Sequence, residues 1–352
     1  MSQSSRSRFV LDVRQSLPGW KQSLFLAASL VVGLAISVAI LWAAGIDPIE
    51  LAGELAGVFN GDSLRGVLVQ AAPLMLVGLA ASLAFRIGFW NLGLEGQMVF
   101  GGIFAGGVSI YEIGPPETRI FLMAVAAAIG GAMWCLVAGL LKIRFRVNEI
   151  IATLLLNYVA VYFLFDLLYG AWQDAKTAFP QSTPFQPFER LHDLGDGVNA
   201  GLLVAIIVIL AAGWLIHFSR VGFYMRFVNA NPNMAKVLGV PVRAVTLWTV
   251  VISGACAGLA GFVNVASQEG RLTESYADGY VFSGVLIAFL SRNDPIIVAV
   301  VGFLIAVLFI TGQTLQVFYQ IPFTMVQLIE AIIVMSVASS EFFIRHRIRW
   351  IR

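Results

Sequence analysis

Long apolar stretches recur along almost the whole chain, and they constrain the fold more than any other feature of the sequence. A transmembrane helix needs about 20 predominantly apolar residues to cross the hydrocarbon core of a bilayer. Backbone that faces lipid must satisfy its own hydrogen bonds, so we expect these stretches to be helices. The apolar stretches lie at 23–44, 64–85, 96–111, 119–141, 148–169, 199–217, 244–265, 279–290, 295–311 and 322–340.

These stretches predict an all-α polytopic membrane protein with about ten transmembrane helices. Only 12% of the 352 residues are charged and 59% are hydrophobic, which excludes an ordinary soluble domain. The stretch at 23–44 is too long for the core of a signal peptide, so we expect it to be retained as the first span. The stretch at 279–290 is too short to cross alone, and we expect a short, tilted or re-entrant helix there.

The distribution of basic residues predicts that both termini are cytoplasmic, because Lys and Arg accumulate in cytoplasmic loops. With this orientation, the inner segments hold most of the 22 Lys and Arg residues. The chain then consists of a cytoplasmic segment at 1–22, a transmembrane domain at 23–340 and a cytoplasmic basic tail at 341–352. The inner basic residues are Arg6, Arg8, Arg14, Lys21, Arg86, Lys142, Arg144, Arg146, Arg220, Arg226, Lys236, Arg243, Arg292, Arg345, Arg347, Arg349 and Arg352.

The two halves of the chain share a faint internal repeat. In the predicted topology the first copy starts outside and the second starts inside, which favours a 5+5 inverted repeat of the kind found in many transporters. The matching strings are Gly78-Leu79-Ala80-Ala81 with Gly258-Leu259-Ala260-Gly261, Glu95-Gly96 with Asp278-Gly279, and Val99-Phe100-Gly101-Gly102 with Val281-Phe282-Ser283-Gly284.

The sequence lacks the motifs that would give it chemistry of its own. It contains no phosphate-binding loop, no zinc-protease motif and no nucleophile elbow. Its two cysteines lie inside apolar stretches, and its three histidines are scattered, so we expect no metal site. We therefore predict no catalytic residue, no cofactor and no nucleic-acid partner. If ATP drives transport, another subunit must hydrolyse it.

Polar side chains inside the apolar stretches indicate a polar interior surrounded by several spans. Amides and hydroxyls outnumber charges, which favours a neutral, hydrogen-bonding solute, although each amide could instead bridge two helices. The glycines of segment 89–97 allow the backbone to break a helix there, and Glu95 should face protein, water or an interface. The candidate residues of the translocation path are Gln70, Asn91, Glu95, Gln97, Asn157, Asn264 and Phe282.

The longest outer segment runs from 170 to 200 and contains three prolines. It is either a solvated connector or a docking surface for an extracytoplasmic partner, and the sequence favours neither.

The inner segment 219–243 contains a short helix with a defined start and stop. Asn231 can cap this helix, with Pro232 at its first position. Gly239 can end it, and Pro241 follows just beyond. Such a helix is either a connector or a rigid knob that inserts into a partner's groove.

Segment 219–243 resembles the cytoplasmic coupling segment of bacterial ABC importer permeases, in the group that includes nucleoside, ribose-type sugar and branched-chain amino acid permeases. Asn229 departs from the usual Gly, and Met234 from the frequent Ala. Segments 91–97 and 147–158 resemble the N-[IL]-G-[VL]-E-G-Q and V-N-E-[VI]-[IV]-x-T-[IL]-[ML]-[LM]-N-Y segments of the nucleoside-type branch. The matching residues of the coupling segment are Gly222, Arg226, Val228, Asn231, Pro232, Ala235, Gly239 and Val240.

The resemblance implies a multi-part importer of the bacterial inner membrane. Its partners would be a second homologous permease, an ATP-binding subunit and an extracytoplasmic substrate-binding protein. The residues expected to couple the chain to the ATPase are Arg226, Asn231, Pro232, Ala235, Lys236 and Gly239.

The expected solute is a nucleoside or a related purine compound, with a simple sugar of the ribose type or a branched-chain amino acid as alternatives. A stand-alone ion-coupled secondary transporter is the alternative class. The lack of buried ionisable pairs disfavours it. A membrane-embedded enzyme is disfavoured by the missing catalytic constellation.

Overall fold

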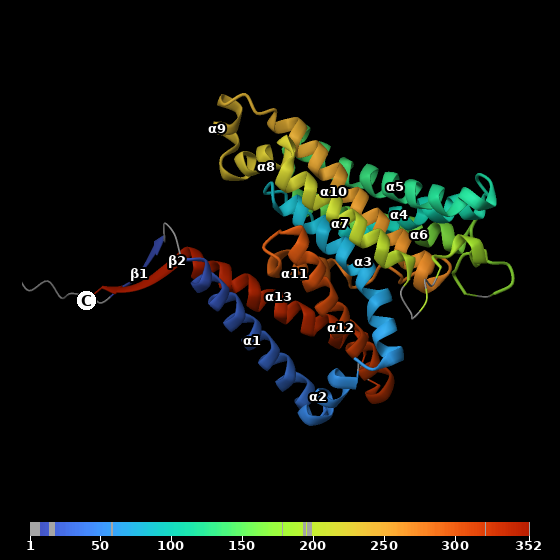
Figure 1. Ribbon diagram of the computed structural model, residues 1–352, viewed down its shortest axis with the longest axis horizontal. Coiled ribbons are helices and arrows are strands. Elements are labelled where there is room, and N and C mark those ends of the chain that lie inside the picture. The colour runs from blue at the N-terminus through green and yellow to red at the C-terminus, as the bar shows by residue number, and fades with distance from the viewer. Residues whose placement is uncertain are drawn as a thin grey trace, which may run out of the picture. The chain divides into compact units, whose positions relative to one another are not determined.

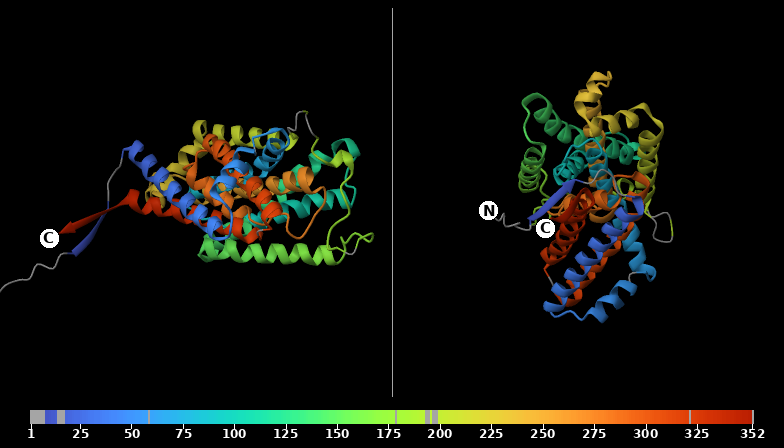
Figure 2. Two further views of the ribbon diagram at one scale, coloured as in Figure 1. Left: turned by 90° about the horizontal axis from the view of Figure 1, so that it is seen from below. Right: turned by 90° about the vertical axis from the view of Figure 1, so that its left-hand side faces the viewer.

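The computed structural model describes residues 8–13, 18–57, 59–177, 179–192, 195, 199–320 and 322–351 (Figures 1 and 2). The predicted inner residues Arg6, Arg14 and Arg352 lie outside the described residues. The chain divides into two compact units. Unit 1 is formed by Met1–Ala52 and Pro322–Arg352, and unit 2 is formed by Gly53–Ile321.

Every apolar stretch predicted from the sequence coincides with a helix. In the part of the chain that the structure describes, eight helices are long and apolar enough to cross a membrane, and α4 and α11 are shorter. A polytopic helical membrane protein is therefore confirmed. The helices are α1 (Gly19–Ala43), α3 (Gly61–Phe85), α4 (Leu94–Ile110), α5 (Pro116–Phe145), α6 (Glu149–Tyr169), α7 (Ala200–Phe218), α10 (Val242–Asn264), α11 (Tyr280–Leu290), α12 (Pro295–Tyr319) and α13 (Phe323–Arg345).

Several shorter elements were not predicted from the sequence. Strand β1 (Arg8–Val13) pairs antiparallel with β2 (His346–Ile351), so that Arg8 lies opposite Ile351 and Val13 opposite His346. Segment 347–350 alternates arginine with a large apolar residue, which is the two-residue period of a strand. The other unpredicted elements are the helices α2 (Pro48–Gly57) and α8 (Arg220–Ala230), and the helical turns η1 (Pro187–Glu189) and η2 (Val265–Glu269). Helix α9 (Pro232–Val237) is the short helix predicted within segment 219–243.

Unit 1 is built on the packing of α1 against α13. Gly33 of α1 faces Ser336 of α13 so closely that an added Cβ would lie 3.1 Å from the Ser336 Cβ. Leu41 of α1 and Val337 of α13 are buried in the same unit. A small residue thus allows close approach of the two helices, as is common in membrane proteins.

The interior of unit 2 is formed by α3 and α10. In their most apolar stretches, 89% of α3 and 78% of the span that contains α10 are buried, compared with 28% for α5 and for α6. Large apolar side chains on α5, α6 and α7 are exposed, including Phe121, Tyr158 and Leu210. An extensive apolar surface on a folded protein marks an interaction site, and for a helical bundle of this composition the bilayer is that partner.

Glycines bring the backbones of α4, α5 and α10 into direct contact. A Cβ added to Gly258 of α10 would clash with the carbonyl oxygen of Ala127 in α5. A Cβ added to Gly101 of α4 would clash with the carbonyl oxygen of Gly258. Since no side chain fits between these helices, their crossing depends on glycine at these positions.

Predicted inner and outer segments lie at opposite ends of unit 2. At one end, Arg86 donates a hydrogen bond from Nη1 to the carbonyl oxygen of Asn293 at 2.9 Å. At the other end, the Ser182 amide donates to the carbonyl oxygen of Leu272 at 3.0 Å, and Trp172 Nε1 donates to the Tyr111 hydroxyl at 3.2 Å. The segment from Leu272 to Asn293 therefore joins the two ends, although only the 11 residues of α11 are helical.

We predict that Gly258→Val lowers the unfolding temperature of the purified chain by roughly 5 °C or more, because the added methyl groups would separate α5 from α10. The measurement is thermal unfolding in detergent, monitored by size-exclusion chromatography. Gly213→Val on α7 is the matched control, because a Cβ there would meet nothing within 4 Å. Equal unfolding temperatures for the two variants would contradict the proposed crossing.

Candidate functional site

Helix α9 is a short, capped helix, as the sequence predicts. The Oδ1 atom of Asn231 accepts hydrogen bonds from the backbone amides of Asn233 and Met234 at 3.0 and 3.2 Å. Pro232 occupies the first helical position. Gly239 follows the helix with a φ of +80°, a conformation that residues other than glycine rarely adopt.

One face of α9 and its C-cap exposes large apolar side chains. Met234, Val237 and Leu238 are 60%, 85% and 63% exposed, and their spacing places them on one side of the helix. Ala235 lies on the opposite side and is buried. Figure 1 shows α9 at one extremity of unit 2, next to α8. This face is suited to contact with another protein, since it is apolar and outside the helical bundle.

Helix α8 connects this region to the ends of α3 and α11. Arg226 of α8 and Arg86 line one pocket together with Asn293 and Asp294. Burial, and then the charge of Arg226, lower the pKa of Arg86, while the charge of Asp294 raises it. Because Arg86 also bonds to the Asn293 carbonyl, the segment that carries α9 is in electrostatic contact with the bundle.

The short helices α4 and α11 both begin inside unit 2, after non-helical backbone. Gly93 precedes α4, and Gly279, with a φ of +85°, precedes α11. The two starts are close together, because a Cβ added to Gly284 of α11 would lie 3.0 Å from Cδ1 of Leu94. Discontinuous helices of this kind form the solute sites of many transporters.

Each of these helix starts carries one carboxylate. Glu95 is in the first turn of α4, and Asp278 lies two residues before α11. The two groups are near enough for their charges to interact. In the described part of the chain, neither forms a hydrogen bond or a salt bridge with another side chain. The partial positive charge at a helix N-terminus stabilises a carboxylate.

Three of the predicted path residues instead hold the segment that precedes α4. Asn91 and Gln97 form a reciprocal amide pair, with distances of 3.0 and 2.8 Å. Asn157 of α6 accepts from the Gly96 amide and donates to the carbonyl oxygen of Leu92, both at 2.9 Å. These buried amides satisfy each other and the backbone, so they serve as bridges between elements.

Two further path residues belong to a network centred on Tyr280. Gln70 Nε2 donates to the Tyr280 hydroxyl at 3.0 Å, and that hydroxyl donates to Asn264 Oδ1 at 3.2 Å. Asn264 in turn donates to the carbonyl oxygen of Tyr276. Neither tyrosine was predicted as a path residue, although their spacing of four residues around Gly279 puts two phenols at the start of a short apolar stretch.

Phe282 is the path residue with the most exposed side chain. It is 46% exposed on α11, whereas its repeat counterpart Phe100 stacks on Trp134 with ring centroids 3.7 Å apart. Glu95 is half-buried, and Gln70, Asn91, Gln97, Asn157 and Asn264 are buried. Of the predicted set, Glu95 and Phe282 are therefore the two that present a side chain outside the bundle interior.

Part of the predicted outer segment, 170–200, packs against the rest of unit 2. Glu189 of η1 is buried and accepts from Arg119 at 2.9 Å and from the Ser109 hydroxyl at 2.7 Å. A buried ion pair needs such additional hydrogen bonds to offset its desolvation. This pair fixes η1 against the start of α5, at the end of unit 2 opposite to α9.

Comparison with known proteins finds one matching family and several relatives. Residues 63–337 match the family described as branched-chain amino acid transport system / permease component. The glucose ABC transporter permease protein TsgB13 of Haloferax volcanii is 33% identical, over 96% of this chain and 93% of that protein. The guanosine ABC transporter permease protein NupP of Bacillus subtilis is 30% identical, over 89% and 92%. The nucleoside ABC transporter permease protein NupB of Lactococcus lactis is 26% identical, over 80% and 81%.

We predict that Asn157→Ala destabilises the chain by about 2 kcal/mol or more, because it leaves the buried Gly96 amide and Leu92 carbonyl without partners. The measurement is the unfolding temperature in detergent. Gln316→Ala on α12 removes an exposed amide and should leave that temperature unchanged. A destabilisation no larger than that of the control would mean that Asn157 does not hold the start of α4.

Proposed function

The chain belongs to the family of branched-chain amino acid transport system permease components, within the ABC transporters, and we propose that it carries a nucleoside or a related purine compound across the membrane. As a permease, it is a transport subunit, and ATP hydrolysis belongs to a separate subunit of the transporter.

The starts of α4 and α11 support a neutral, hydrogen-bonding solute. The carboxylates of Glu95 and Asp278 can accept hydrogen bonds from the N–H groups of a base or the hydroxyls of a ribose. An exposed aromatic ring such as Phe282 can stack on a base. Solute sites built at broken helices lie near the middle of the bilayer, where the two repeats meet. The relatives named for guanosine and for nucleosides favour this solute class.

A simple sugar is the second candidate. The relative with 33% identity is named a glucose permease, and sugar hydroxyls would also donate to carboxylates. A branched-chain amino acid fits this site less well. Its own carboxylate would be repelled by Glu95 and Asp278 unless a cation intervened.

We propose that the exposed face of α9 docks on the ATP-binding subunit. The apolar side chains of Met234, Val237 and Leu238 would enter a groove of that subunit, with Lys236 and Arg226 contributing charge at its edge. The hydrogen bond from Arg86 to the 293 carbonyl joins the ends of α3 and α11, next to Arg226 of α8, so a displacement of α8 and α9 would act on this junction. A second homologous permease and an extracytoplasmic binding protein would complete the importer, with the η1 region as the docking surface of the latter.

The proposed topology has both termini in the cytoplasm of a bacterial cell and a 5+5 inverted repeat in the inner membrane. The clustering of basic residues at the α9 end of unit 2 supports this orientation. The repeat is supported by the two shorter apolar helices, α4 and α11, whose starts carry matching strings: Glu95-Gly96 in the first turn of α4, and Asp278-Gly279 just before α11. The family assignment disfavours the alternative class, a stand-alone ion-coupled carrier.

We predict that the double variant Val237→Asp/Leu238→Asp lowers ATP-driven uptake at least about tenfold, because it places two charges in an apolar interface. Uptake of radiolabelled solute is measured in proteoliposomes that contain the cognate ATP-binding subunit and binding protein, together with copurification of the ATP-binding subunit. Arg220→Gln, which removes an exposed charge from α8, is the control. Uptake that persists in the double variant, or that needs no ATP, would disprove the coupling role.

We predict that Glu95→Gln/Asp278→Asn lowers nucleoside uptake by about tenfold, since amides accept hydrogen bonds more weakly than carboxylates. Unlabelled guanosine, glucose and leucine are compared as competitors of labelled guanosine in the same assay. Glu117→Gln, at an exposed outer position, should leave uptake intact. If only glucose competes, the solute is a sugar. If the double variant retains full uptake, neither carboxylate contacts the solute.

A further inference from the structure

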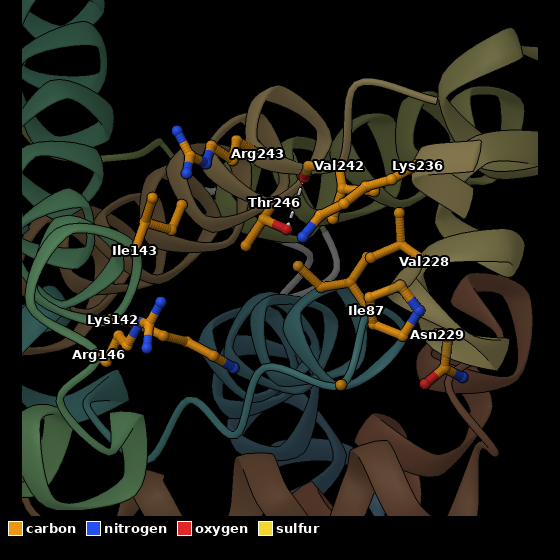
Figure 3. Close-up of a pocket in the computed structure, with 12 residues that line it drawn as sticks. Ile87, Lys142, Ile143, Arg146, Val228, Asn229, Lys236, Val242, Arg243 and Thr246 are labelled. Carbon is orange, nitrogen blue, oxygen red and sulfur yellow. Dashed lines mark hydrogen bonds between the residues drawn. The ribbon is translucent and has the colours of Figure 1, made fainter. Parts of the chain in front are cut away.

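A basic pocket of about 510 Å³ lies beside α9, between the ends of α5 and α10 (Figure 3). We propose that it binds a phosphate-type anion, supplied either by the headgroup of an anionic phospholipid or by a soluble phosphate compound. This site is separate from the solute path, although Lys236 also flanks the exposed face of α9, and the proposal goes beyond the proposed function.

Four cationic side chains from three helix ends line the pocket. Lys142 is in the last turn of α5 and Arg146 is its C-cap, Lys236 belongs to α9, and Arg243 is in the first turn of α10. Figure 3 shows Lys142 and Arg146 on one side of the pocket and Lys236 and Arg243 on another. None of the twelve described residues that line it is acidic.

Protein carboxylates neutralise little of this charge. Lys142 pairs with Glu149 at 2.6 Å. Arg146, Lys236 and Arg243 form no salt bridge with any residue that the structure describes. Three cations held around one cavity repel one another, so a bound anion would relieve a repulsion that the fold itself imposes.

The start of α10 adds a further attraction for an anion. Pro241 precedes this helix and provides no side-chain cap, so although the Val242 amide donates to the Val240 carbonyl, the amides of Arg243 and Ala244 have no capping side chain. Lys236, Pro241, Val242, Arg243 and Ala244 also line an adjoining cavity at this helix start. The hydroxyl of Thr246 donates to the Val242 carbonyl at 2.9 Å, so its proton is not available to an anion. The attraction therefore comes from the cations and from the start of α10.

Two exposed aromatic side chains place the pocket at the level of lipid headgroups. Phe145 and Trp248 are 70% and 63% exposed; Phe145 adjoins Arg146, and Trp248 lies two residues after Thr246. Tryptophan concentrates at the membrane–water interface. Basic pockets between transmembrane helices on the cytoplasmic side hold anionic headgroups. A bound phosphate would link α9 to the ends of α5 and α10 and restrict its movement.

The test uses the purified full-length chain and needs no partner subunit, so its result is independent of transport. Native mass spectrometry follows titration with phosphatidylglycerol or phosphatidylcholine, and isothermal titration calorimetry measures inorganic pyrophosphate binding. The test variant is Arg146→Gln/Arg243→Gln, and both side chains are exposed. Arg144→Gln is the matched control, because Arg144 is exposed on the same helix and does not line the pocket.

We expect wild type and Arg144→Gln to bind phosphatidylglycerol in preference to phosphatidylcholine, and the double variant to bind it about tenfold more weakly. If the double variant loses pyrophosphate binding, and wild type shows no preference for phosphatidylglycerol over phosphatidylcholine, the ligand is a soluble phosphate compound. Undiminished binding of both probes by the double variant, or binding of neither probe by wild type, would overturn the proposal. If the double variant unfolds, the two single variants provide the same comparison.

Discussion

The satisfaction of backbone hydrogen bonds inside the bilayer is the constraint on which the rest of this structure depends. Continuous helices satisfy their own backbone, but α4 and α11 start inside unit 2, where their first amides and the carbonyls before them need other partners. The chain meets this need with side chains. Asn157 completes the backbone bonds of Leu92 and Gly96 at the start of α4. These bonds therefore help to fix where α4 begins.

Glycine supplies the second requirement, which is close packing around these breaks. The backbones of α4, α5 and α10 touch at Gly101, Gly131 and Gly258. This contact leaves no space for solute between those three helices. The path proposed above, past Glu95 and Phe282, would therefore run along the starts of α4 and α11, outside this three-helix contact.

The sequence predicted the helices and the ends of α9 well, because both depend on local patterns. Hydrophobic stretches of sufficient length determine spans, and the Asn231, Pro232 and Gly239 spacing determines a capped short helix. The partners of the polar side chains could not be predicted, because Gln70 and Tyr280 are 210 residues apart in the chain. For the same reason, the sequence shows Arg146, Lys236 and Arg243 only as separate inner charges, and the structure brings them to one pocket. The number of spans also stayed open, since α11 is short and non-helical backbone completes its passage.

The hydrogen bond between the Arg86 side chain and the carbonyl of residue 293 places different demands on the amino acids at the two positions. The acceptor is a main-chain carbonyl, which every amino acid provides, and Asn293 adopts a φ of +61°. Asparagine and glycine tolerate that conformation best, so replacement by glycine would preserve the bond. At position 86, a long side chain that ends in a forked cation is needed to reach the carbonyl. During evolutionary drift, mutations should therefore accumulate at one end of this link while selection removes them at the other.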